Sequence, residues 1–328
     1  MHIQNYIMIC NIIELGRQKM AILVVGTIFL DVKGFPLETY IPDGRNAGRV
    51  EYVHGGVARN VVEDIANVEL KPVFLSMVDD TPMGSDVLEK LKRHKVNCEH
   101  VLVEPNGMGP WLAVFDNNGD VAGSISKRPL VRALVDYVDR QGDEIFKGID
   151  SVVLQMDLER DLVKKIINLA EKHKAKIYGI ISNMSIAVER RDFIKKLDCF
   201  VCNQHEAGLL FIDDYSECTM EEMKDILLEK IRSANITSMV VTMGSKGSVY
   251  ATMSGESGIC PSKKVRVIDT TGAGDSFVAG VAMGLTYGKS LHEACEIGTK
   301  LAASVITSVE NVCPRFMPEE LGLEVESV

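Results

Sequence analysis

The sequence predicts a doubly wound α/β fold, in which helices cover both faces of a mostly parallel sheet, together with a small separate β-sheet. From residue 131 onward, apolar patterns typical of helices and of buried strands alternate along the chain. Such alternation favours parallel strands joined by helical crossovers. Residues 22–25 form an apolar strand that ends at Gly26, a common opening for this fold. An Asn-Gly pair at 118–119 lies between two alternating runs and predicts a hairpin outside the main sheet.

The composition is that of an ordinary globular protein. The chain has 328 residues, of which 46% are hydrophobic and 25% charged, so it can bury a full core. Its net charge of −10 argues against nucleic acid or an anionic membrane as the main partner. No apolar run approaches the ~20 residues that are needed to cross a bilayer. The eight cysteines are scattered, which predicts reduced thiols and a cytoplasmic protein.

The N-terminal residues 1–19 are expected to be an extension of uncertain order. Their apolar run at 6–13 precedes Arg17 and Lys19, which reverses the charge-then-apolar order of a secretory signal. We therefore expect one folded domain over residues 20–328.

The small sheet is expected from segments inserted early in the chain. Short alternating runs at 37–41 and 49–53 are flanked by prolines and glycines, and the hairpin comes later. These place the strands of the small sheet at about 30–54 and 109–126. The rest of the main fold is predicted as strands near 73–78, 151–155, 176–181, 199–202 and 238–242, and helices near 83–95, 133–147, 159–173, 188–197 and 219–233.

The clearest functional signal is the run DTTGAGDSF at residues 269–277. A β-branched segment at 264–268 predicts a strand before it, and apolar residues recur at helical spacing after it. Gly272 and Gly274 allow close approach of the backbone to a ligand, and the unpaired N–H groups and dipole of the helix favour an anion. Asp275 is then either an ordinary first-turn acid or a base toward a hydroxyl that attacks a phosphate.

Three other elements place glycines or polar residues beside predicted strands. Residues 55–60 (GGVARN) lead into a helical apolar stripe, and Asp31 follows the first strand, where it would face the ligand crevice of such a sheet. Asn203 and Glu206 follow another strand, either facing that crevice or serving as an ordinary helix cap and first-turn acid. Residues 242–247 (TMGSKG) form a Gly-rich turn after a strand.

In order and spacing, these elements resemble the ribokinase-type (pfkB) family of carbohydrate and nucleoside kinases. The run at 269–277 is similar to the C-terminal signature of that family, and the Gly-Gly-x-x-x-Asn element to its N-terminal signature. The resemblance extends from about Ala21 to the C-terminus. It implies that Asp275 is the catalytic base and that the amides of Gly272, Ala273 and Gly274 form an anion hole.

The same resemblance implies the ligand contacts. Hydroxyl groups of the substrate would be held by Asp31, Gly55, Gly56 and Asn60. ATP would be bound by Asn203, Thr242, Gly244, Ser245, Gly247 and Thr271. Mg²⁺ would be organised by Glu206 through water, and a monovalent cation such as K⁺ would bind near Asp269. The small sheet would form a lid over the substrate, and in this family such lids often pair into homodimers.

The reaction implied by the resemblance is ATP-dependent phosphorylation of a hydroxymethyl group on a sugar or nucleoside. Residues 55–60 and 116–120 are similar to the pseudouridine-kinase branch of the family. The segments 124–128 and 181–183 depart from that branch, so the substrate stays open.

Several alternatives follow from the same residues. Lys127 and Arg128 are either contacts for an anionic substrate, as in a sugar-phosphate kinase, or surface charges. A catalytically idle regulator that binds a sugar or nucleoside would use the same fold, although the intact Asp275 argues against it. A vitamin or pyrimidine-alcohol kinase on the related fold is disfavoured by the Gly55-Gly56 pair and the predicted lid.

Overall fold

The computed structural model describes residues 20–325, so the predicted extension at 1–19 lies outside the described part of the chain. Within that part the main sheet has nine strands, in the order β13-β12-β11-β10-β9-β8-β1-β4-β5. In this order, the seven strands from β11 across to β5 run parallel, and β12 and β13 are antiparallel additions at one edge. The strands are β1 (Ile22–Val25), β4 (Val73–Val78), β5 (Val101–Val103), β8 (Ser151–Gln155), β9 (Lys176–Ile180), β10 (Cys199–Asn203), β11 (Ser238–Thr242), β12 (Gly247–Thr252) and β13 (Ser257–Pro261).

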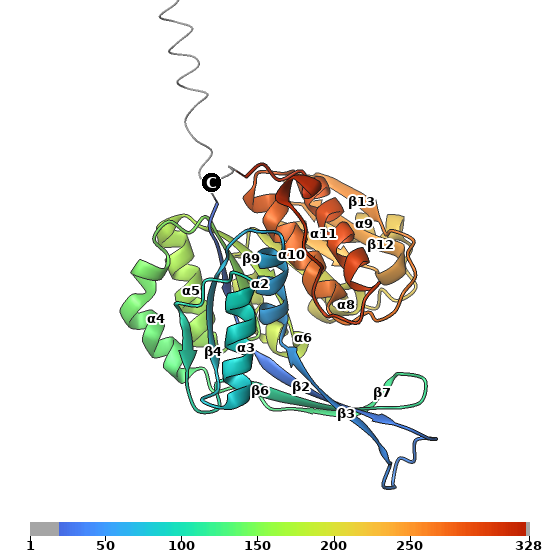
Figure 1. The fold of residues 1–328 in the computed structure, drawn as a ribbon. Helices are drawn as coiled ribbons and strands as arrows, with labels where there is room; N and C mark the ends of the chain where they lie inside the picture. The colour runs from blue at the N-terminus through green and yellow to red at the C-terminus, as the bar shows by residue number, and fades with distance from the viewer. Residues whose placement is uncertain (1–19, 326–328) are drawn as a thin grey trace, which may run out of the picture.

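Helices cover both faces of this sheet (Figure 1), which confirms the predicted doubly wound α/β fold. Alternate residues of β1 point to opposite faces: Leu23 packs in the core beneath α4, α5 and α9, and Val24 in the core beneath α2, α3, α10 and α11. The helices are α2 (Val57–Asn67), α3 (Pro82–Arg93), α4 (Arg132–Ile145), α5 (Arg160–His173), α6 (Met184–Ala187), α7 (Arg191–Ile194), α8 (Gln204–Phe211), α9 (Met220–Ala234), α10 (Ala273–Thr286) and α11 (Leu291–Val305). Short 3₁₀ turns are η1 (Val188–Arg190), η2 (Gly244–Lys246) and η3 (Pro318–Leu321).

The order of the strands reverses between β1 and β8. From β1 the chain moves to β4 and β5 on one side, and from β8 it moves through β9 and β10 to β11 on the other. In open α/β sheets, ligands bind at the carboxyl ends of the strands beside such a reversal. The segments that follow β1, β8 and β10 are therefore the ones expected to line a site.

A second sheet projects from the main body (Figure 1). Within the described residues it has four strands in the order β3-β2-β6-β7, namely β2 (Phe29–Pro36), β3 (Gly48–Gly55), β6 (Gly109–Phe115) and β7 (Val121–Ser126). The predicted hairpin at 116–119 is confirmed: β6 and β7 pair antiparallel, and the Asp116 carboxylate accepts hydrogen bonds from the Asn118 and Asp120 N–H groups. Gly119 supplies the positive φ of 86° that this turn requires.

Two of the predicted strands are absent from the described structure. Residues 264–268 form an irregular segment beyond the edge strand β13, where Val267 and Ile268 are more than half exposed and no strand lies alongside to pair with them. Residues 37–41 form a turn beyond β2, because their alternating apolar side chains face solvent: Leu37 is 74% and Ile41 54% exposed. A period-two pattern predicts a strand only where one face is buried.

The predicted helix at 188–197 is broken into η1 and α7, after the short helix α6. The break lies at Arg190, which leaves the helical conformation while its guanidinium donates a hydrogen bond to the Met156 carbonyl. Among residues 20–325, no helix is both long enough and apolar enough to cross a membrane.

Candidate active site

Helix α10 begins at the DTTGAGDSF run without a side-chain cap. Gly272 occupies the N-cap position with φ of 81°, and a Cβ there would lie 2.0 Å from the Asn311 carbonyl oxygen. The first helical hydrogen bond runs from Ser276 N to Gly272 O, so the N–H groups of Gly274 and Asp275 lie ahead of it. Only glycine fits the position that opens this helix, and the helix presents backbone donors and the positive end of its dipole.

Asp275 lies in the first turn of α10 and is held from another helix. Its Oδ2 accepts a hydrogen bond from Asn60 Nδ2 at 2.6 Å. Burial raises the pKa of Asp275 to about 7, while the bond from Asn60 and the nearby charge of Arg59 act in the opposite direction. A carboxylate with a pKa near neutrality is suited to take up a proton in the working range of an enzyme.

The start of α2 assembles the other residues of the N-terminal signature. Asn60 lies on α2, and Asp31 lies on the neighbouring strand β2. A Cβ on Gly55 would lie 2.3 Å from the Asp31 carboxylate, so any other residue there would displace the Asp31 side chain from its present position. Burial raises the pKa of Asp31 to about 6, against the opposing charges of Lys33 and Arg59.

These residues line one cavity of about 680 Å³, which we call the central cavity. It brings together five of the predicted site residues, namely Asp31, Gly56, Asn60, Thr271 and Asp275. Phe29, Trp111, Leu130 and Leu158 supply apolar wall. The cavity therefore combines acidic and amide groups with flat apolar surface, in a volume suited to a small molecule.

The central cavity also contains a polar cluster, of which the sequence pointed only to Arg128. Arg128 donates from Nη2 to Asp157 Oδ2 at 2.8 Å and from Nη1 to the Asp157 carbonyl at 2.6 Å. Ser182 donates to the same carboxylate through its N–H and its hydroxyl. Asp157 is 1% exposed, so it fixes the Arg128 guanidinium at the cavity wall. The available signal was the position of Asp157, two residues after the end of β8 and beside the reversal of strand order.

A groove of about 480 Å³, which we call the C-terminal groove, meets the central cavity at the N-terminus of α10. The groove contains Ala273 and Gly274, whereas Thr271 and Asp275 face the cavity. It also contains four predicted nucleotide contacts from the end of β11 and the turn after it, namely Thr242, Gly244, Ser245 and Gly247. The free N–H groups at the start of α10 therefore separate two hollows that could each hold one reactant.

The pair Asn203 and Glu206 forms a helix cap. The Asn203 side chain accepts from the Glu206 N–H at 2.8 Å, and Glu206 Oε2 accepts from the Asn203 N–H at 2.7 Å. Burial, together with the negative charge of Asp157, raises the pKa of Glu206. Asn203 and Glu206 therefore form an ordinary capping box, and the Glu206 carboxylate lies near that of Asp157.

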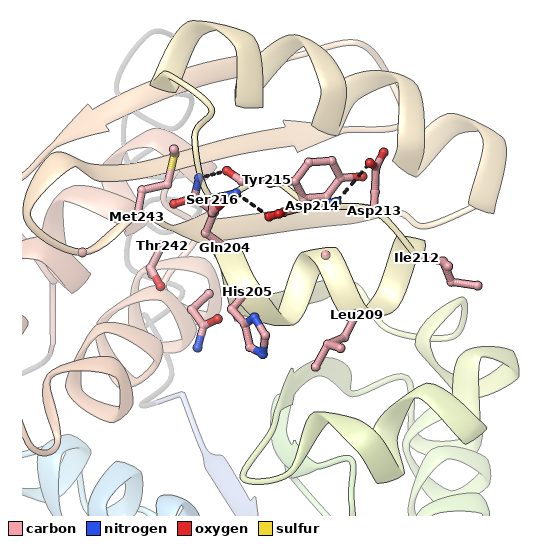
Figure 2. Close-up of a pocket in the computed structure, with 13 residues that line it drawn as sticks. Gln204, His205, Leu209, Ile212, Asp213, Asp214, Tyr215, Ser216, Thr242 and Met243 are labelled. Atoms are coloured by element: carbon pink, nitrogen blue, oxygen red, sulfur yellow. Dashed lines mark hydrogen bonds between the residues drawn. The ribbon is translucent and has the colours of Figure 1, made fainter. Parts of the chain in front are cut away.

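A third hollow, of about 690 Å³, lies between α8 and the segment after it (Figure 2). Gln204 and His205 line it from α8, and Asp214 and Tyr215 from the following loop, whose Tyr215 carbonyl accepts a hydrogen bond from Gln204. The predicted nucleotide residue Asn203 lines this hollow and not the C-terminal groove. The two hollows share Thr242 and Gly244, and neither contains Asp275.

The side chain of Asp269, which was predicted to lie near a monovalent cation, forms a hydrogen bond within its own turn. Its Oδ1 accepts from the Thr271 N–H at 2.8 Å, and this bond lowers its pKa although burial opposes the shift. Within the described residues there is no group of three or more His, Cys, Asp or Glu side chains that could hold a metal ion. The donor set therefore fits a Mg²⁺ ion that is held mainly by phosphate oxygens and water, with Glu206 nearby, and not one held in a protein cage.

The reversal point of a doubly wound sheet, a buried carboxylate at an uncapped helix N-terminus, and two hollows that meet there together define a phosphotransferase-type site. The profile of the pfkB family of carbohydrate kinases matches residues 19–312. The chain belongs to this family and is a sugar or nucleoside kinase.

Individual relatives agree with this assignment. A guanosine-inosine kinase from Exiguobacterium acetylicum is 36% identical over 292 residues, which cover 88% of this chain and 95% of the relative. A pseudouridine kinase from Escherichia coli is 25% identical over 316 residues, covering 90% and 98%. The structure of Arabidopsis thaliana ribokinase complexed with ribose and ATP matches with a TM-score of 0.80 at 19% identity, covering 94% of this chain and 100% of that one, and so supports the fold.

Proposed function

We propose that this protein phosphorylates the 5′-hydroxymethyl group of a purine ribonucleoside at the expense of ATP. The observation that carries the proposal is the position of Asp275, which faces the central cavity at the N-terminus of α10 while Gly274 faces the C-terminal groove. A hydroxyl bound in the cavity would thereby meet a phosphate bound in the groove.

In the proposed reaction, Asp275 accepts the proton of the substrate hydroxyl as its oxygen attacks the γ-phosphorus of ATP. The bond from that phosphorus to the β–γ bridging oxygen breaks, and ADP leaves. The N–H groups of Gly272 and Gly274 stabilise the negative charge on the transferred group, aided by the dipole of α10, and that of Ala273 does so once it gives up its hydrogen bond to the Thr270 carbonyl. Asp31 and Asn60 hold the ribose hydroxyls, and the second sheet covers the substrate and excludes water.

The nucleotide is assigned to the C-terminal groove. Thr242, Gly244, Ser245 and Gly247 contact it from the turn after β11, and Asn203 and Thr271 approach its phosphates. Mg²⁺, when bound, neutralises phosphate charge, and Glu206 orients its water ligands. Asp269 is the side chain assigned to a monovalent cation such as K⁺.

The purine assignment rests on similarity and on the chemistry of the cavity. The relative that acts on guanosine and inosine is 36% identical to this chain, against 25% for the pseudouridine kinase. A nucleobase is flat and apolar with a polar edge, and Trp111 and Leu158 provide apolar wall beside the fixed guanidinium of Arg128. Arginine N–H groups match the O6 and N7 acceptors that guanosine and inosine share.

One alternative substrate is supported by a particular observation. Pseudouridine remains the second candidate substrate because of the full-length similarity to that kinase. A sugar phosphate is disfavoured: the Arg128 charge is already paired with Asp157, and Lys127 is exposed with its Nζ on Asn106. An idle regulator would bind nucleoside but not consume ATP.

An ATP-consumption assay tests the proposal. The purified protein with Mg²⁺ would be given inosine, guanosine, adenosine, pseudouridine, ribose, fructose and two sugar phosphates, each with and without K⁺. Turnover with inosine or guanosine supports the proposal. Turnover with pseudouridine alone would make pseudouridine, and not a purine ribonucleoside, the substrate. Turnover with a sugar phosphate alone would show that the substrate is not a nucleoside. Nucleoside binding by thermal shift without any turnover would establish the regulator.

We also propose that two copies pair through the second sheet. Register places Tyr52, Val32, Leu112 and Ile125 in one row across its four strands, and Tyr52 is 64% and Ile125 71% exposed. An apolar face of this kind is self-complementary in a two-fold dimer. Light scattering of Ile125→Lys should report a monomer where the parent protein reports a dimer. The seven described cysteines are free thiols, which supports the proposed cytoplasmic location.

A further inference from the structure

Helix α2 carries an ion pair inside the protein, directly behind the central cavity. Arg59 is 1% exposed and Glu63, one turn later, is fully buried, with Arg59 Nη2 2.9 Å from Glu63 Oε2. Removing two charges from water is costly, and a buried pair is often replaced by apolar residues with no loss of stability. A buried pair beside a catalytic carboxylate therefore calls for a functional explanation.

Arg59 is connected to Asp275 through one amide. Arg59 Nη1 donates to Asn60 Oδ1 at 2.5 Å, and Asn311 Nδ2 donates to the same oxygen at 3.3 Å. Because the amide oxygen of Asn60 is occupied by these donors, its NH₂ group is turned to Asp275 Oδ2, at 2.6 Å. A flipped amide would instead present its oxygen to the carboxylate and repel it.

We propose that Arg59 is a positioning residue for the reaction: paired with Glu63, it fixes the orientation of the Asn60 amide and places a positive charge behind Asp275. The inference rests on the proposed role of Asp275 as the base. Arg59 itself touches neither reactant, since it lies behind Asn60 and outside the lining of the central cavity.

The charges around Asp275 show why such a residue is needed. Burial is the main cause that raises the pKa of Asp275; Asp31 on β2 and Glu206 on α8 add to it, and Asp64 on α2 interacts unfavourably with Asp275. Arg59 opposes this trend at Asp275 and also at Asp31. One buried guanidinium thus offsets several carboxylates of the site.

The decisive experiment compares the pH dependence of kcat in two variants, with inosine, guanosine and pseudouridine offered as substrates. Glu63→Gln keeps Arg59 in place, whereas the double variant Arg59→Met, Glu63→Gln removes the guanidinium without leaving a lone buried carboxylate. In each variant kcat should fall at low pH, and we call this part of the pH profile the acid limb. The acid limb of the double variant should lie about one pH unit or more above that of Glu63→Gln, because a nearby opposite charge has been lost. That shift corresponds to roughly tenfold slower turnover at pH 6 and a smaller loss at pH 8.5.

Two further variants complete the test. Arg59→Lys keeps the positive charge but not the planar guanidinium. Its acid limb should lie at the same pH as that of the parent protein. If the double variant does not fold, this comparison tests whether the charge of residue 59 sets the acid limb. Lys90→Met removes another partner of Glu63, 3.2 Å away, without touching Asn60, and should leave the acid limb unmoved.

A purely structural ion pair predicts a different result. If Arg59→Met, Glu63→Gln and Glu63→Gln alone give the same acid limb, or if Arg59→Lys fails to restore it, the positioning role is wrong. If the parent protein consumes no ATP with any nucleoside, the proposed function has failed. If the parent is active but Asp275→Asn turns over normally, Asp275 is not the base and the role of Arg59 is overturned with it.

Discussion

Helices α8 and α10 begin near each other in the same crevice, and each has an acidic residue at its third helical position. In α8 the N-cap is Asn203, and Glu206 turns back to close a capping box on its own backbone. In α10 the N-cap is Gly272, which has no side chain to offer, so Asp275 is held by Asn60 and faces the cavity. The residue at the N-cap thus decides whether the acid and the first N–H groups of a helix serve the fold or remain available to a ligand.

The largest expected effect comes from removing the available acid. Asp275→Asn should fold and bind nucleotide but lose ~10²–10⁴-fold in kcat, the usual contribution of a positioned base. The matched change Glu206→Gln keeps a residue able to close the capping box, and should instead weaken Mg²⁺ by about 10- to 100-fold, as expected for a contact made through water. Steady-state kinetics over a range of Mg²⁺ concentrations separates a loss of kcat from a loss of Mg²⁺ affinity. If both variants showed the same dependence on Mg²⁺, Asp275 and Glu206 would not have the different roles proposed here.

The uncapped start of α10 can be tested at Gly272. Gly272→Ala places a Cβ 2.0 Å from the Asn311 carbonyl and at a φ of 81°, so the helix start or the 311–313 segment must move. We expect about a 10²-fold loss in kcat from the displaced N–H groups, together with a lower thermal midpoint. Gly288→Ala, at a φ of 75° with open space around it, is a control for backbone strain alone, and should lower the midpoint but spare kcat. Equal losses of kcat would show that strain, not the anion hole, accounts for the effect.

The pH dependence of the site follows from the same contrast. The pKa of Asp275 is raised by burial to about 7, so kcat should fall about tenfold per pH unit below 7. Stability should move the opposite way: between the ordinary pKa of 3.8 and the raised value, the folded state binds more protons than the unfolded state, so this group lowers stability as pH rises. Asp275→Asn should therefore raise the thermal midpoint at pH 8 and leave it near the parent value at pH 4, as scanning calorimetry would show; a midpoint raised equally at both would contradict the assigned ionisation.

The smallest effect is expected from the caps themselves. Asn203→Ala removes the side chain that caps α8, and Ser290→Ala does the same for α11, which has an equivalent capping box with Glu293. Each should lower the free energy of unfolding by about 1 kcal/mol in urea. Only Asn203→Ala should also raise the KM for ATP, because Asn203 is assigned to the phosphates, whereas Ser290 lies at the opposite end of α11 from Thr299 and Ala302, which line the C-terminal groove. An unchanged KM in both would leave Asn203 a purely structural residue.

Sequence patterns predicted those parts of the protein in which local periodicity and burial agree. The parallel strands β8 and β11 were predicted with their observed bounds, because buried strands leave continuous apolar runs. The strand expected at 264–268 is wrong, since β-branched residues there have no neighbouring strand and lie exposed over a groove. Pattern alone does not say what stands beside a segment.

For the candidate site, motifs led to Asp31, Asn60 and Asp275, which do line one cavity. The residues that support them were not evident. Arg59 sits inside the GGVARN motif but its burial depends on Glu63 and on Asn311, which is 252 positions away. Asp157 and its contact with Arg128 likewise depend on two loops that meet only in the fold. Long-range polar contacts of this kind leave no periodic trace in a single sequence.

The segment after α11 has a consequence for how the protein is made. Asn60 receives a bond from Asn311, Asp64 accepts from the Cys313 N–H, and Asn67 donates to the Cys313 carbonyl, so the helix that begins the fold is completed by residues about 250 positions later. On a ribosome, α2 emerges before this segment, so these polar groups of α2 lack their partners until residues 311–313 have been synthesised. A chain that stops short of residue 311 therefore carries the GGVARN motif without the contacts that complete α2.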